Sequence, residues 1–118
     1  MRLIYHITIR KAWDNSLERG AYHAESLNTV GFIHCSTREQ LVGVANAFYR
    51  DVPDLVILAI DEDLADNVRY EAPAEDGYAS PEDRFPHVYG LISVEAVVQV
   101  VGFPAGKDGQ YELPGDLI

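Results

Sequence analysis

The sequence predicts a compact α+β domain built from five or six short strands and two helices. Its 118 residues suffice for one hydrophobic core and leave little room for a second domain. Residues 55–60 are apolar at every position, which is typical of a central strand that is covered on both faces. Residues 37–50 carry apolar side chains with the i, i+3, i+4, i+7 spacing of a half-buried helix.

The first expected element is a strand over residues 3–10, whose side chains alternate between two faces. Its odd-numbered positions are apolar from Leu3 to Ile9, so they are expected to face the core. The opposite face is mixed, which would let His6 and Thr8 look into a cleft.

A short helix is expected over residues 11–19. Trp13 and Leu17 form an i, i+4 pair on one of its faces, and Gly20 is suited to cap its C-terminus. Residues 21–30 show no clear period, so we expect a loop there with at most one helical turn.

The next expected strand, residues 31–36, leads into the second helix. Phe32, His34 and Ser36 share one face of this strand. Ser36 and Glu39 also fit a capping box, in which the Ser36 oxygen accepts from the Glu39 amide and the Glu39 carboxylate reaches back. The helix is therefore expected to begin one residue after Ser36 and to run to about residue 50.

The second half of the chain holds shorter elements. Asp61 ends the central strand and is placed to cap a turn at residues 62–65. The other expected segments are a strand at 68–71, a mobile loop at 72–82, a helical turn at 91–96 and a last strand at 97–103. The Gly- and Pro-rich residues 104–118 are expected to form a loose tail or to wrap along an edge, which leaves residues 1–103 as the single domain.

Composition excludes several classes of protein. The chain has 19 acidic and 9 basic residues, a net charge of −10, and no stretch that concentrates Lys and Arg, so a nucleic-acid partner is not expected. It has no apolar run long enough to cross a membrane. Its single cysteine excludes an internal disulfide framework and a multi-cysteine zinc site, and a cytoplasmic location is the default expectation. Common nucleotide-binding, hydrolase and metalloprotease motifs are absent from the sequence.

Three of the four histidines lie in ordered-looking segments: His6 in IYHIT, His34 in GFIHCS and His87 in FPHVYG. Strands that are distant in sequence meet in one sheet, so these histidines could share a site. There they would donate hydrogen bonds to a ligand or exchange protons near neutral pH. The alternative is that each is a structural histidine. No two of them have the spacing that builds a metal site, so none is assigned as a metal ligand.

Cys35 and Glu71 also have predicted roles. Cys35 alternates away from His34 on its strand and is expected to be a buried, unreactive thiol rather than a nucleophile. Glu71 closes the expected strand at 68–71, where a carboxylate can face a ligand. The alternative for Glu71 is a solvated charge at the edge of the sheet.

The segments IYHIT, GFIHCS, LVILAID and FPHVYG, in this order, resemble the bacterial and plant family known as domain of unknown function nine-five-two. The resemblance covers residues 3–101 and is supported by Trp13, Tyr22 and Gln40. That family is similar in fold to the ADP-ribosyltransferases. The resemblance therefore implies a compact, split antiparallel β core with two or three flanking helices.

The same resemblance implies roles for the histidine segments. IYHIT matches the first-strand motif that holds a ribose of NAD, and His34 stands where other members place a tyrosine that stacks on nicotinamide. This arrangement resembles the two-histidine branch that includes the RNA 2′-phosphotransferases. The candidate catalytic residues are His34, His87 and Glu71. The candidate ligand-binding residues are His6, Thr8, Ser36 and Tyr89.

Three functions stay open on this basis. The first is an enzyme that acts on NAD, ADP-ribose or a related nucleotide in a histidine-lined cleft, with transferase-like or phosphotransferase-like chemistry. The second is a non-catalytic small-molecule-binding domain that uses the same cleft, and the third is a structural interaction domain. No cofactor is required by the sequence itself. The expected partner is a small-molecule ligand, with no nucleic acid and no membrane, and the oligomeric state is left open.

Overall fold

A central antiparallel sheet organises the computed structural model, which describes residues 1–74 and 79–118. Its strands are β1 (Leu3–Ile9), β4 (Leu55–Asp61) and β8 (Val97–Gly102), in the order β1-β4-β8. The apolar strand at residues 55–60 thus lies in the middle, as predicted. The side chains of residues 55–60 alternate between two separate core clusters, and all six are buried because both faces of the sheet are covered.

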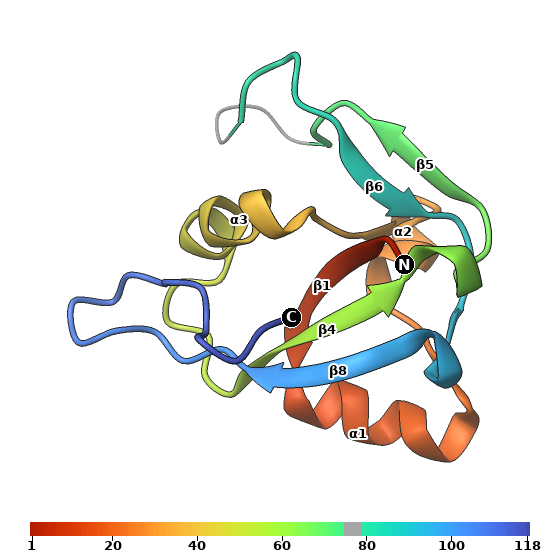
Figure 1. Ribbon diagram of the computed structural model, residues 1–118, viewed down its shortest axis with the longest axis horizontal. Helices are drawn as coiled ribbons and strands as arrows, with labels where there is room; N and C mark the ends of the chain where they lie inside the picture. Colours follow the sequence, from red (N-terminus) through yellow and green to blue (C-terminus); the bar gives the residue numbers. More distant parts are fainter. Residues whose placement is uncertain (75–78) are drawn as a thin grey trace.

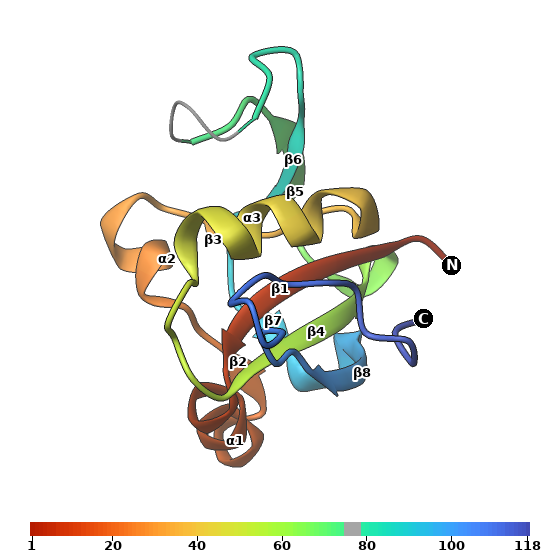
Figure 2. The same cartoon turned by 90° about the vertical axis from the view of Figure 1, so that its left-hand side faces the viewer.

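Different elements cover the two faces. On one face lie α1 (Arg10–Arg19) and α2 (Glu25–Thr29), which pack with residues of two small sheets around Trp13, Tyr22 and Ile33. On the other face lie α3 (Leu41–Phe48) and the C-terminal residues, which pack around Leu41 and Phe103. Figures 1 and 2 show α1 and α3 on opposite sides of the central strands.

The two smaller sheets complete the architecture. One pairs β2 (Ala21–Tyr22) with β7 (Ile92–Ser93), and the other has the order β3-β6-β5, with β3 (Ile33–His34), β6 (Phe85–Val88) and β5 (Val68–Glu71). The β5–β6 pair extends beyond the central sheet at the top of Figures 1 and 2. The part of the chain that the structure describes therefore holds eight strands in three antiparallel sheets, which confirms the α+β class.

Helix α1 follows the sequence prediction at its end and departs from it on its buried face. Gly20 caps the helix with φ 79°, a left-handed conformation that glycine adopts without strain. The expected pairing of Trp13 with Leu17 is wrong, since Leu17 is 51% exposed. Ser16 is buried beside Trp13 instead, and it can be buried because its hydroxyl donates to the Trp13 carbonyl at 2.6 Å.

The predicted capping box is displaced by one residue. Thr37, not Ser36, is the N-cap of a 3₁₀ turn, η1 (Arg38–Gln40), which leads into α3. Ser36 cannot begin the turn because its backbone is paired with Tyr5 through two hydrogen bonds of 2.7 and 2.8 Å. The partner in the box is Gln40, whose side-chain oxygen accepts from the Thr37 amide at 2.9 Å. Helix α3 ends at Phe48, two residues before the expected end.

Several local predictions in the second half are confirmed. Asp61 caps η2 (Glu62–Leu64) by accepting from the Asp63 amide at 3.0 Å. A 3₁₀ turn, η3 (Val94–Ala96), lies where a helical turn was expected, although β7 takes the two residues before it. The expected mobile loop at 72–82 includes residues 75–78, which lie outside the described residues.

The C-terminal residues 104–118 form no helix or strand, but they are not a loose tail. Tyr111 and Leu117 are buried in the core cluster on the α3 side of the sheet. The Tyr5 hydroxyl donates to the Ile118 carbonyl at 2.7 Å, which fastens the end of the chain to β1. The segment therefore packs over the α3 side of the sheet, whereas the sequence predicted a loose tail or a wrap along an edge.

Candidate functional site

A cavity of about 240 Å³ lies where α3 faces β3 and β6. Most of its lining is apolar or aromatic, and its polar groups come from the two strands and from the residues after β3. The residues that line it are Ile7, His34, Cys35, Ser36, Val44, Phe48, Tyr49, Ala74, Phe85 and His87. An apolar concavity with a few convergent polar groups is the usual form of a small-molecule site.

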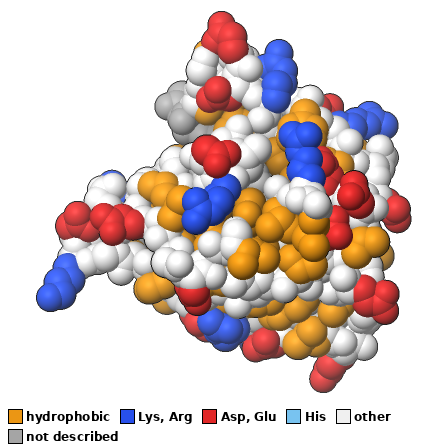
Figure 3. Space-filling model, in the orientation of Figure 1, with side chains coloured by type: hydrophobic (Ala, Val, Ile, Leu, Met, Phe, Trp, Pro, Cys, Tyr) orange, Lys and Arg blue, Asp and Glu red, His pale blue; other side chains and the backbone are white. Residues whose placement is uncertain are grey.

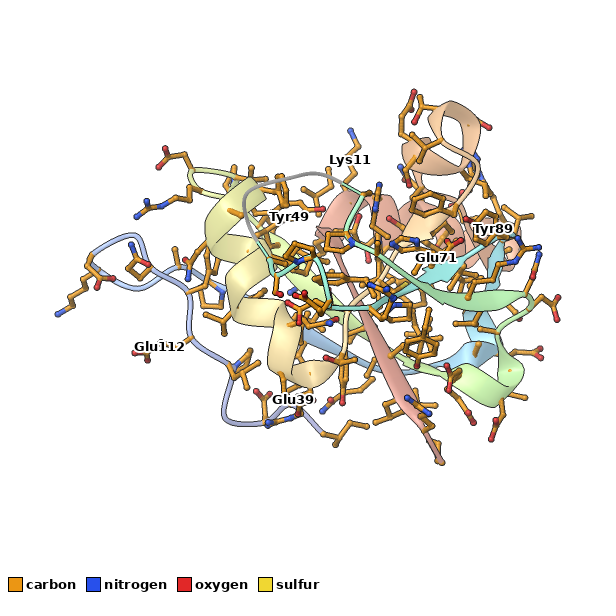
Figure 4. The ribbon with its side chains drawn as sticks, turned by 90° about the horizontal axis from the view of Figure 1, so that it is seen from above. Lys11, Glu39, Tyr49, Glu71, Tyr89 and Glu112 are labelled. Atoms are coloured by element: carbon orange, nitrogen blue, oxygen red, sulfur yellow. The ribbon has the colours of Figure 1, made fainter. Side chains whose placement is uncertain are left out.

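His87 is the polar group with the most defined surroundings. Its Nδ1 lies 2.9 Å from Glu71 Oε1, and its side chain is only 4% exposed. The Tyr89 hydroxyl donates to the same Glu71 oxygen at 2.5 Å. Glu71 ends β5 and His87 lies on the paired strand β6, so the sheet register brings these side chains together. Figure 4 shows Glu71 and Tyr89 side by side.

The hydrogen-bond directions follow from the donors and acceptors available. A carboxylate only accepts, so His87 must donate through Nδ1–H, which leaves Nε2 as the acceptor of the neutral ring. Glu71 accepts hydrogen bonds from Tyr89, which has the larger effect, and from His87. These two bonds hold the pKa of Glu71 below its usual range. The same carboxylate raises the pKa of the Tyr89 hydroxyl. Glu71 is therefore a fixed anion that orients the His87 ring.

Aromatic rings fix both cavity histidines. The Phe32 ring stacks on His87 with centroids 4.1 Å apart and an interplanar angle of 16°. Phe32 also meets the His34 ring edge-on at 4.8 Å, and the two histidine rings are 5.9 Å apart in a T-shaped arrangement. Phe32 was not predicted as a site residue, although its place on the same strand face as His34 was the signal that could have found it.

Ser36 adds an unpaired hydroxyl to this wall. The residue is 4% exposed and lines the cavity, yet its Oγ has no hydrogen-bond partner among residues 1–74 and 79–118. Among the same described residues, His87 Nε2 likewise has no hydrogen-bond partner. Both residues line the cavity, and a ligand that covers a polar atom must replace its hydrogen bonds to water, so these two atoms are suited to meet a polar ligand.

His6 and Thr8 belong to a separate buried network. His6 does not line the cavity; its Nδ1 lies 2.5 Å from the His34 carbonyl and its Nε2 lies 2.8 Å from the Tyr22 hydroxyl. That hydroxyl is 2.9 Å from Thr8 Oγ1. Burial lowers the pKa of His6 from 6.5 to about 4, so the ring is neutral near pH 7. The structure thus places His6 and Thr8 where they support the strand that carries His34.

Cys35 is buried, as predicted, with 3% of its surface exposed. It contributes to the cavity wall, and burial raises the pKa of its thiol. A thiol in this setting stays protonated near neutral pH and lacks the character of a nucleophile.

Neither Lys nor Arg lies in the described lining of the cavity. Of the arginines nearby in sequence, Arg69 lies over the Tyr89 ring at 4.6 Å and Arg84 donates to the Pro81 and Asp83 carbonyls at 3.0 Å. Within residues 1–74 and 79–118, no group of three or more His, Cys, Asp and Glu side chains could hold a metal ion.

The chain belongs to the family described as Protein of unknown function (DUF952), whose model matches residues 7–100. This match confirms the family expected from the sequence. The further likeness to ADP-ribosyltransferases stays a prediction. No protein with a curated function matches the chain.

Solved structures of one bacterial protein share this fold. The chain is similar to the crystal structure of Protein CC0527 from Caulobacter crescentus, with 32% sequence identity, 93% of each chain covered and a TM-score of 0.79. The solution NMR structure of that protein matches with 31% identity, covering 93% of this chain and 91% of that chain, and a TM-score of 0.76. In the described part of the chain, every helix is too short or too polar to span a bilayer.

Proposed function

We propose that the chain binds a small molecule in this cavity, through the ring and ribose of NAD, ADP-ribose or a related nucleotide. The observation that supports this most directly is the state of His87. The ring lines an apolar cavity, its Nδ1 is held by Glu71, and its Nε2 is left for a ligand. Such a histidine can accept a hydrogen bond or a proton from a ribose hydroxyl.

The size and lining of the cavity suit one part of a dinucleotide. Ligand cavities usually measure roughly 300–1,000 Å³, so a cavity of about 240 Å³ holds a ring with its ribose rather than a whole dinucleotide. The His34, Tyr49 and Phe85 side chains offer surfaces on which a planar ring can pack. The diphosphate of NAD finds no cation in the described lining, so it would lie outside the cavity.

The chemistry available to the chain is proton transfer at His87 Nε2. When His87 accepts a proton from a ligand hydroxyl, the ring becomes a cation, and the adjacent Glu71 carboxylate stabilises that charge. Glu71 thereby acts through His87, as an orienting group. We assign the acid–base role to His87 and ligand contact to His34 and Ser36.

A non-catalytic binding domain is the second candidate function. It is favoured by the absence of any carboxylate from the described lining, since transfer at a ribose carbon needs a group that stabilises the positive charge that develops. In both cases the ligand is small. A cytoplasmic location, where such nucleotides are abundant, is part of the proposal.

The surface charge argues against RNA as the ligand. The chain carries a net charge of −10, and acidic side chains lie among basic ones across the face shown in Figure 3. A polyanion would be repelled by this distribution.

Titration monitored by the histidine NMR signals tests the proposal. NAD and ADP-ribose, added to millimolar concentration at low salt, are expected to shift the signals of His34 and His87, whereas a short RNA leaves them unchanged. The exposed His23 serves as the internal control. If neither NAD nor ADP-ribose shifts the signals of His34 and His87, the proposal is contradicted.

Two substitutions separate a ligand site from a structural one. His34→Ala is expected to abolish binding and to leave the melting temperature nearly unchanged, because the side chain is exposed. His23→Ala is the matched control and should bind normally. If His34→Ala unfolds the protein, its histidine is structural and the assignment is wrong.

A further inference from the structure

The charge around the cavity identifies the ligand more closely. We infer that the site prefers an uncharged nucleoside to the phosphorylated form of the same nucleoside. This inference rests on the proposed function, because it concerns the same cavity and the same contacts. The inference adds which form of the ligand, phosphorylated or unphosphorylated, the cavity binds more tightly.

The first argument is the absence of Lys and Arg from the described walls. The lining holds neither Lys nor Arg, and its charged neighbour is an anion, Glu71, bound to His87. Moving a phosphate from water into this cavity removes its hydration and provides no Lys or Arg in return. The Glu71 carboxylate does not line the cavity but lies behind the His87 ring, and it repels a phosphate across that ring.

The arginines that could be recruited already have partners. Arg69 lies over the Tyr89 ring and donates from Nε to Asn67 Oδ1 at 3.4 Å. Arg84 donates to two backbone carbonyls, and Arg38 donates to the Leu117 carbonyl at 3.5 Å. Each would have to leave these contacts to reach a phosphate in the cavity.

The second argument is the kind of polar atom that the walls offer. In the neutral form that donates Nδ1–H to Glu71, the His87 ring presents Nε2 as an acceptor, and the Ser36 hydroxyl can both donate and accept. A ligand that matches His87 Nε2 and the Ser36 hydroxyl carries an O–H or N–H donor and a neutral acceptor. Ribose hydroxyls and the amide and amino groups of bases supply both, whereas a phosphate dianion supplies acceptors alone.

The test compares four matched pairs of probes. Adenosine, guanosine, cytidine and uridine are each titrated beside their 5′-monophosphates, and Kd is measured by calorimetry at low salt. At least one nucleoside is expected to bind about tenfold or more tightly than its monophosphate, because the described walls offer the phosphate neither Lys nor Arg in place of its hydration.

Two variants show whether the Glu71 carboxylate, which lies behind His87, contributes to the preference. Glu71→Gln is expected to reduce the difference in Kd between each nucleoside and its monophosphate. Glu112→Gln removes the same charge at a distant place, as the labels in Figure 4 show, and should leave the difference unchanged. Ser36→Ala should weaken nucleoside binding severalfold without changing the fold.

The outcomes are distinguishable. Monophosphates that bind as tightly as nucleosides would overturn this inference and leave the proposed function standing. Binding of neither class would overturn both. An equal effect of Glu71→Gln and Glu112→Gln would show that net charge, not the wall of the cavity, sets the preference.

Discussion

At the scale of single residues, the buried network around His6 shows how a histidine can serve a site without touching the ligand. The His34 carbonyl can only accept, so His6 donates to it through Nδ1–H. The Tyr22 hydroxyl lies 2.8 Å from His6 Nε2 and 2.9 Å from Thr8 Oγ1, so it links these two side chains. This chain fixes the tautomer of His6 and the position of the strand that carries His34.

The network predicts a specific dependence of stability on pH. In the unfolded chain His6 takes up a proton near pH 6.5, whereas in the folded protein burial lowers its pKa to about 4. Its contribution is therefore complete above pH 6.5 and is lost as the pH falls from 6.5 to 4. The full loss is about 3 kcal/mol at the lower limit.

Urea unfolding between pH 7 and pH 4 measures this effect. His6→Asn keeps a neutral amide donor and does not titrate in this range, so its unfolding free energy should fall less steeply with decreasing pH. Equal slopes for the two proteins would show that His6 is not held neutral by burial.

The thiol of Cys35 gives a second prediction at this scale. Because the residue is buried and its pKa is raised, a thiol reagent at pH 8 is expected to label the native protein far more slowly than the unfolded protein. Labelling at similar rates in both states would restore Cys35 as a candidate nucleophile.

At the scale of elements, the start of α3 shows what a sequence pattern leaves undetermined. Ser36 and Thr37 can both cap a helix, and a sequence does not show which of them is held in an extended conformation by a distant strand. The pairing of Ser36 with Tyr5 makes that choice. By contrast, the strand at 68–71 and the Asp61 cap depend on neighbouring residues, and both were predicted correctly.

Two substitutions test this cap. Thr37→Ala is expected to lower the free energy of unfolding by about 1 kcal/mol, the usual contribution of an N-cap. Ser36→Ala should cost less, because the Ser36 hydroxyl makes no hydrogen bond within the described chain. Chemical denaturation measures both, and a larger loss for Ser36→Ala would return the cap to Ser36.

At the scale of the whole molecule, the site could be predicted only in part. His34, His87 and Ser36 come together at the cavity, and Glu71 and Tyr89 join them because β5 and β6 pair. The placement of His6 in the core could not be predicted, because the alternating pattern of β1 does not show that Tyr22 will cover its mixed face. The roles of Phe48 and Tyr49 depend on where α3 packs, which is a tertiary property.

The last prediction concerns the C-terminal segment. It tests whether residues 104–118 belong to the folded unit. Leu117 is 5% exposed and packs in the same cluster as Tyr5 and Phe103. Leu117→Ala is therefore expected to lower the free energy of unfolding by about 2–5 kcal/mol, through lost burial and the cavity left behind.

Leu91→Ala is the matched control, because Leu91 is 53% exposed and its loss should change stability by about 0.5 kcal/mol or less. Thermal unfolding of both variants measures the difference. If the segment were loose in solution, the two substitutions would have equal and small effects. If it packs as the structure shows, only Leu117→Ala lowers the melting temperature. Binding at the cavity should then persist below that temperature, because Leu117 does not line it.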